Sequence, residues 1–231
     1  MNRRTHGWWH ASRVLITTLA ALAAIPAAAQ DVCGSLQNSY GPMDYRSAPQ
    51  NVRDLVESHH FTKKVELLQG GQETYIGGDI DYTLRAFPNH PRALLAMMNL
   101  SFREKRDPPP NSRYSVTCWF ERAERFQPDD PMVKVLYGSF LVRLGKKDEA
   151  AKKLDTAAAS HDLGPNEAYN LGLAYSDLGR YDDALKFAHM AYEMGFPLPG
   201  LRDRLVKAGK WKDLPPLEKA DASAPAADAK P

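Results

Sequence analysis

Residues 131–164, PMVKVLYGSFLVRLGKKDEAAKKLDTAAASHDLG, and residues 165–198, PNEAYNLGLAYSDLGRYDDALKFAHMAYEMGFPL, are two copies of one 34-residue pattern. Small residues recur in the same phase, as Gly138 and Gly172, Gly145 and Gly179, Ala150 and Ala184, and Ala157 and Ala191. Such a period is typical of stacked helical hairpins, each too small to bury its apolar face alone. The repeat therefore predicts an all-α protein and favours binding over chemistry.

The last copy contains two helices divided by a glycine. Pro165 suits the first helical position, where its missing N–H costs nothing. Gly179 ends this helix, and a second helix follows it and stops before Gly195. Small residues at Gly172 and Ala184 allow the two helices to approach closely.

This copy resembles a tetratricopeptide repeat. Residues 170–175 and 179–184 match that family's pattern of Leu-Gly, aromatic, Gly, Tyr and Ala in one register. The early Trp of the pattern is replaced by Ala168, and its terminal Pro by Phe196. The resemblance implies a solenoid of helical hairpins.

The resemblance extends, more weakly, over residues 80–212, with about three repeats and a capping helix. An earlier third copy carries an insertion around Pro108-Pro109-Pro110, which favours an extended connector over helix. Residues 80–87 are expected to form the last helix of a half-repeat, capped by Asp79. A charged helix over residues 201–208 is expected to close the stack.

The N-terminal 29 residues are predicted to be a secretory signal peptide. Three arginines precede an apolar run over residues 14–25, and Ala27-Ala28-Ala29 provides a cleavage site. Removal of these three arginines from the 30 basic residues leaves 27 against 28 acidic residues. A nearly neutral mature chain gives no indication of nucleic-acid binding, and no membrane anchor is expected after cleavage.

Residues 30–79 do not fit the repeat and are expected to form an irregular, partly helical segment packed on the first hairpin. Residues 40–46 and 78–89 are similar to uncharacterised exported tetratricopeptide proteins of Gram-negative bacteria. That resemblance implies a periplasmic location but no activity. Residues 213–231, rich in Ala, Pro, Asp and Lys, are predicted to be a disordered tail.

The chain has two cysteines, Cys33 and Cys118. In an oxidising compartment such a pair indicates one disulfide, worth ~4 kcal/mol for a loop of this length in the chain-entropy model. Two buried thiols are the alternative. A catalytic thiol is less favoured because there is no C-x-x-C motif.

Catalytic and metal-binding motifs give no support for an enzyme. The sequence has no Ser-x-x-Lys, G-x-S-x-G or H-E-x-x-H. Adjacent His59 and His60 point different ways on a helix and suit one metal poorly. We therefore expect a non-enzymatic protein without metal or cofactor.

The expected binding surface is the concave groove, which the first helix of each repeat lines in the tetratricopeptide family. By that resemblance the groove residues are Ala96, Leu100, Arg103, Val135, Ser139, Val142, Arg143, Tyr169, Asn170, Leu173, Ser176 and Asp177. Their mixed apolar and polar character favours a protein or peptide ligand. The alternative for each position is an ordinary solvated or packed residue.

Two functions follow as hypotheses. The first is a periplasmic scaffold that binds proteins, as part of an envelope assembly. The second is a periplasmic glycan- or small-ligand-binding protein, with Tyr114, Trp119, Tyr169 and Tyr175 as stacking surfaces. The sequence leaves the partner, the pathway and the oligomeric state open.

Overall fold

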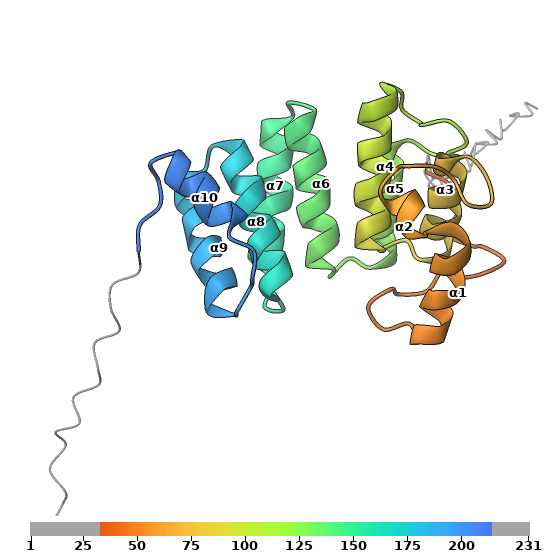
Figure 1. The fold of residues 1–231 in the computed structure, drawn as a ribbon, viewed down its shortest axis with the longest axis horizontal. Helices are drawn as coiled ribbons and strands as arrows, with labels where there is room; N and C mark the ends of the chain where they lie inside the picture. The colour runs from red at the N-terminus through yellow and green to blue at the C-terminus, as the bar shows by residue number, and fades with distance from the viewer. Residues whose placement is uncertain (1–32, 214–231) are drawn as a thin grey trace, which may run out of the picture. The chain divides into compact units, whose positions relative to one another are not determined.

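The computed structural model describes residues 33–213, which lie within one compact unit. This range contains ten α-helices and no strand (Figure 1). The expected all-α class is therefore confirmed. The expected signal peptide over residues 1–29 lies outside the described residues, as does all but the first residue of the expected tail over 213–231.

Most of the helices pair as successive hairpins. α4 packs on α5, α6 on α7 and α8 on α9, and α6 also contacts both α4 and α8. Within the described range, no helix is long and apolar enough to cross a bilayer. The helices are α1 (Gln50–His60), α2 (Lys63–Glu66), α3 (Ile76–Ala86), α4 (Pro91–Glu104), α5 (Val116–Phe126), α6 (Pro131–Arg143), α7 (Lys147–Ala158), α8 (Pro165–Leu178), α9 (Tyr181–Glu193) and α10 (Gly200–Lys207).

Local sequence explains where the first helix of each hairpin begins and ends. α4, α6 and α8 each begin with a proline, which has no N–H to leave unpaired. Asp130 caps α6 by accepting from the N–H groups of Met132 and Val133 at 3.0 and 3.4 Å. Gly145 and Gly179 follow α6 and α8 with φ of 77° and 83°, a left-handed conformation that glycine adopts at little cost.

The repeated small residues allow the two helices of a hairpin to touch. A Cβ on Gly138 would lie 3.5 Å from the carbonyl oxygen of Ala150, and one on Gly172 would lie 3.2 Å from that of Ala184. The same pair of positions therefore makes the same close approach in two hairpins. This recurrence gives the 34-residue period its physical basis.

Two large apolar clusters share the helices of the middle hairpin. One cluster joins α2 to α7, and the other joins α6 to α10. α6 contributes Val133 and Phe140 to the first cluster and Val135 to the second. The apolar core therefore continues from hairpin to hairpin, as a stack of small units requires.

The N-terminal segment is more helical than its sequence indicates. α1 and α2 form the helical part expected within residues 30–79, but α3 begins at Ile76, earlier than the helix expected over residues 80–87. Asp79 lies inside the first turn of α3, so its predicted role as the N-cap is wrong. Its carboxylate instead accepts from the backbone N–H groups of Gln72, Glu73 and Thr74 at 2.6, 3.2 and 3.3 Å. The buried aspartate thus folds the preceding loop back onto the helix.

A disulfide and a buried arginine fasten the start of the described chain to α5. Cys33 and Cys118 form the expected disulfide, with Cα atoms 5.1 Å apart. Arg122, one turn after Cys118 and only 1% exposed, donates through Nη1 to the carbonyl oxygens of Cys33, Gly34 and Ser35 at 2.9, 3.2 and 2.8 Å. We call these three contacts the Arg122 clamp. The clamp and the disulfide both hold Cys33 on α5, by different chemistry.

Gly138→Ala tests the close helix contact inside a hairpin. The new Cβ would lie 2.5 Å from Cδ2 of Leu154, which is fully buried. Overpacking of this kind costs about 1–3 kcal/mol, against roughly 1 kcal/mol gained in helix propensity. We expect the free energy of unfolding in urea to fall by about 1 kcal/mol.

A double-mutant cycle separates this clash from other effects of the substitution. Leu154→Ala alone should cost about 2–5 kcal/mol, and less in the Gly138→Ala background, because the two side chains compete for one space. Ser139→Ala, at the next position, should change stability by less than about 0.5 kcal/mol. Additive effects of Gly138→Ala and Leu154→Ala would contradict the proposed clash.

Candidate functional site

A cleft of about 440 Å³ opens where the first turns of α4, α6 and α8 meet the N-terminal segment. Its floor is apolar and consists of Leu95 from α4 and Met132 and Leu136 from α6. Leu95 is 40% exposed, although its neighbours in α4 are mostly buried. The cleft therefore presents an apolar side chain to solvent at a place where two helices from successive hairpins meet.

One wall of the cleft is fixed by a network that we call the polar lock, made of Asp44, Asn89, Asp130 and Arg46. Asn89 Nδ2 donates to Asp44 Oδ1 at 2.7 Å and to Asp130 Oδ2 at 2.9 Å. Asn89 Oδ1 accepts from the backbone N–H of Tyr45 at 3.0 Å. The lock joins the N-terminal segment, the turn before α4 and the cap of α6, although these parts are far apart in sequence.

Two carboxylates meet in the polar lock, and Arg46 supplies the positive charge between them. Its Nη2 lies 2.7 Å from Asp44 Oδ2, and its Nε lies 3.4 Å from Asp130 Oδ2. The hydrogen bond from Arg46, helped by Asn89 and opposed by partial burial, lowers the pKa of Asp44 to about 2. Asp44 is therefore ionised at neutral pH and keeps its bonds to Asn89 and Arg46.

The same wall contains a cluster of Tyr45, Glu57, His90 and Arg92. The ring of Tyr45 stacks on that of His90 with centroids 3.9 Å apart, and its hydroxyl donates to Glu57 Oε1 at 2.8 Å. Arg92 Nη2 donates to Glu57 Oε2 at 2.8 Å and to the Tyr45 hydroxyl at 3.2 Å. This cluster fixes Tyr45 and Arg92, both of which line the cleft.

His90 is completely buried in this cluster, so its charge state matters. Its Nδ1 accepts from the N–H of Ala93, which places the proton of the neutral ring on Nε2. Nε2 lies 3.3 Å from Glu57 Oε1, although the two groups are not well aligned for a hydrogen bond. Burial lowers the pKa of His90, and Glu57 only partly offsets this effect. Contact with His90, together with donors from Tyr45 and Arg92, lowers the pKa of Glu57 to about 2 despite its burial.

The opposite wall belongs to α8 and carries Asn166, Glu167 and Asn170. Asn170 Nδ2 donates to the carbonyl oxygen of Asn166 at 2.8 Å. The cleft thus has guanidinium groups on one side and amide and carboxylate groups on the other. Such a lining provides hydrogen bonds and an apolar contact for a bound chain.

A hollow of about 520 Å³ lies at the other end of the described chain, beside α9, α10 and Trp211. Trp211 packs back onto the last hairpin, next to His189 and Tyr192. The Arg202 guanidinium lies 5.1 Å from the Trp211 ring centre and covers one face of the indole. We take the cleft as the candidate site because residues from three successive hairpins and the N-terminal segment converge on it.

The structure divides the twelve expected groove residues into three groups. Ala96, Leu100, Val135, Tyr169 and Ser176 are buried, so these five offer no surface to a partner. Ser139, Val142, Asn170 and Leu173 are half-buried, and Arg103, Arg143 and Asp177 are exposed. Of the twelve, Asn170 lines the cleft.

Packing against other segments accounts for the burial of these residues. α2 and α3 pack on α4, which covers Ala96 and Leu100. Tyr169 stacks on Phe196 with centroids 4.1 Å apart, so the connection after α9 covers it. Arg143 stacks on Phe102 at 3.8 Å and donates to Asn99 at 2.7 Å, and therefore lies against α4.

The rings expected to stack on a sugar are not open either. Trp119 and Tyr175 are each 1% exposed, and Tyr169 is 8% exposed. Tyr114 is half-buried against the Arg122 guanidinium, 4.6 Å from its ring centre. These four residues therefore belong to the core and to the N-terminal attachment, and they form no stacking platform.

Sequence reasoning missed Tyr45, Arg46, Asn89, Arg92 and Leu95 as site residues. Tyr45, Arg46 and Asn89 lie in the two stretches, 40–46 and 78–89, that resemble exported proteins, and this was the available signal. Their partners lie too far away in sequence for any local pattern to show. Comparison with protein-family models, curated proteins and solved structures gives no match for this chain.

The charge states around His90 predict loss of stability in acid. The pKa of His90 in the folded protein lies below its usual value of 6.5. Below pH 6.5 the unfolded chain therefore binds more protons than the folded protein, and the free energy of unfolding falls as the pH drops. The folded pKa of Glu57 is about 2 against a usual 4.5, so its contribution is present above 4.5 and is lost below. Urea unfolding at a series of pH values measures both effects.

Two glutamine variants test whether Glu57 causes the loss of stability below pH 4.5. Glu57→Gln should flatten the loss of stability below pH 4.5, because it removes the carboxylate that must be protonated. Glu149→Gln, whose side chain is 58% exposed, should leave the profile of the wild type unchanged. A stability that stays constant from pH 7 down to pH 4 would contradict the charge states described for His90 and Glu57.

Proposed function

We propose that this chain is an exported helical-repeat scaffold of the tetratricopeptide type, which binds an extended or helical segment of a partner protein in the cleft. The observation that carries the proposal is the exposed Leu95 on an apolar floor, between two walls of fixed polar groups. A small exposed apolar patch with a polar rim is typical of a site for protein interaction.

The character of the repeat supports the same function. Helical hairpins in phase provide a rigid surface, and the first helices of three successive hairpins contribute to this cleft. The Tyr45 hydroxyl donates to Glu57, and the Tyr45 ring stacks on buried His90, so these contacts hold Tyr45 in place beside the cleft. This arrangement suits recognition by shape and a few hydrogen bonds.

Export is the second part of the proposal. The predicted signal peptide motivates it, and the Cys33–Cys118 disulfide is compatible with it, because disulfides persist in oxidising compartments. We propose that the protein lies in the periplasm and that its partners belong to an assembly of the cell envelope. Fractionation of cells that produce the full chain tests the location directly.

Leu95→Glu tests the cleft. Random peptides displayed on phage are selected on the oxidised protein, and the enriched peptides are synthesised and titrated by calorimetry. We expect Leu95→Glu to weaken their binding by at least about tenfold, which equals about 1.4 kcal/mol, because the carboxylate replaces the apolar contact on the floor.

Leu144→Glu is the matched control. Leu144 is 45% exposed, follows the last residue of α6 and lies outside the cleft, so its substitution should leave peptide affinity unchanged. Both variants are surface changes that should preserve the fold. Absence of enriched peptides, or equal binding by Leu95→Glu and the wild type, would exclude the cleft as the binding site.

A further inference from the structure

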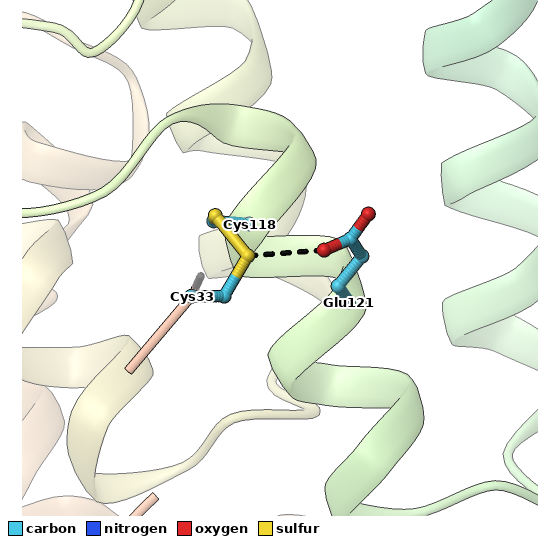
Figure 2. Close-up of side chains that lie close together, drawn as sticks. All are labelled: Cys33, Cys118 and Glu121. Carbon is cyan, nitrogen blue, oxygen red and sulfur yellow. Dashed lines mark hydrogen bonds between the residues drawn. A yellow bond between two sulfur atoms is a disulfide. The ribbon is translucent and has the colours of Figure 1, made fainter. Parts of the chain in front are cut away.

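Cys33, Cys118 and Glu121 form a compact cluster of potential metal ligands. Their sulfur and carboxylate oxygen atoms all lie within 4.8 Å of one another. Cys118 and Glu121 are three positions apart on α5 and therefore face the same way. Figure 2 shows the Glu121 carboxylate pointing at the disulfide, with Oε2 3.0 Å from Cys33 Sγ.

The contact between Glu121 and Cys33 can be a hydrogen bond in the reduced state but not in the oxidised state. A disulfide sulfur carries no proton, so it cannot donate a hydrogen bond to the carboxylate. After reduction, the Cys33 thiol can donate its proton to Glu121 at the observed distance. The carboxylate is thus better matched to the reduced cysteines than to the disulfide.

Hydrogen bonds hold the N-terminal segment on α5 independently of the disulfide. The Arg122 clamp binds the carbonyl oxygens of residues 33–35, and Arg125 Nη2 donates to the Gly34 carbonyl at 2.8 Å. Hydrogen bonds to a charged donor are stronger than those between neutral groups. Cys33 therefore remains beside Cys118 without the covalent bond.

The charge of the ligand set suits a divalent cation. Zn²⁺ binds cysteine in its thiolate form. Two thiolates and one carboxylate then carry three negative charges, which a divalent cation balances in part.

We propose that the reduced form of this protein binds one Zn²⁺ through Cys33, Cys118 and Glu121. A dithiol reductant first transfers two electrons, so that the S–S bond breaks, both cysteines become thiols and the reductant becomes a disulfide. Zn²⁺ then displaces the two thiol protons, which pass to solvent. Thiolate and carboxylate ligands with an open fourth position for water match the tetrahedral preference of this ion.

The geometry requires only small movements. Zn–S bonds of ~2.3 Å and Zn–O bonds of ~2.1 Å in a tetrahedron place the ligand atoms roughly 3.5–4 Å apart. The three ligand atoms already lie within 4.8 Å of one another. The metal ion would tie the N-terminal segment to α5 in place of the disulfide, a property independent of the proposed function of the cleft.

Calorimetry with Zn²⁺ alone tests the site. The protein without a histidine tag is reduced with a phosphine, and circular dichroism first confirms that its helix content equals that of the oxidised protein. We expect one equivalent of Zn²⁺ to bind the reduced form and none to bind the oxidised form. Co²⁺ in the same site should show thiolate-to-metal charge-transfer absorption, and Zn²⁺ should raise the melting temperature of the reduced form only.

Glutamate variants on α5 identify the third ligand. Glu121→Gln should weaken Zn²⁺ binding by at least about tenfold, and Glu121→His should restore it, because imidazole is a good ligand for this ion. The control is Glu124→Gln, which removes a partner of Lys153, 2.6 Å away, outside the cluster. This variant should bind Zn²⁺ like the wild type.

Several results would overturn the proposal. Equal Zn²⁺ binding by the oxidised protein would show that other residues hold the metal. Unchanged affinity in Glu121→Gln would remove the carboxylate from the site. Absence of stoichiometric binding, or loss of helix content on reduction, would contradict the requirement that the Arg122 clamp keeps Cys33 beside Cys118.

Discussion

The candidate site depends on one buried side chain, Asn89, which is 1% exposed. Its amide bonds Asp44, Asp130 and the backbone of Tyr45, and thereby connects the N-terminal segment to the starts of α4 and α6. An amide suits this position because it donates to two carboxylates and accepts from an N–H at the same time. A polar network built around a buried amide favours one geometry, since leaving buried Asn89 or Asp130 without partners is costly.

The hairpins and the N-terminal segment have different roles in the account. The hairpins supply a rigid, repeated framework in which Gly138 and Gly172 allow close helix contact. The N-terminal segment is fastened to that framework at one end by Cys33 and the Arg122 clamp, and further along by the polar lock. It thereby adds the wall of Tyr45 and Arg46 that the repeats alone do not have.

The ends of the helices were predictable from the sequence. The burial of residues under segments distant in sequence was not. The helix starts at Pro131 and Pro165 and the left-handed Gly179 follow from local chemistry, and the structure agrees with them. Leu100 was expected in a groove and is buried, because α3 packs on α4 and no period in the sequence shows that contact. The cleft wall was missed for the same reason, since Tyr45 and Asn89 are 44 positions apart and meet only in the folded chain.

Amide hydrogen exchange in Asn89→Ala tests the central claim, that the polar lock holds the N-terminal segment as a wall of the cleft. The account predicts that exchange at residues 43–47 accelerates by at least about tenfold, corresponding to about 1.4 kcal/mol, because the acceptor of the Tyr45 N–H is removed. Exchange in α9, which is remote from the lock, should stay at the wild-type rate. Unchanged protection at residues 43–47, or an equal loss of protection in α9, would contradict the claim.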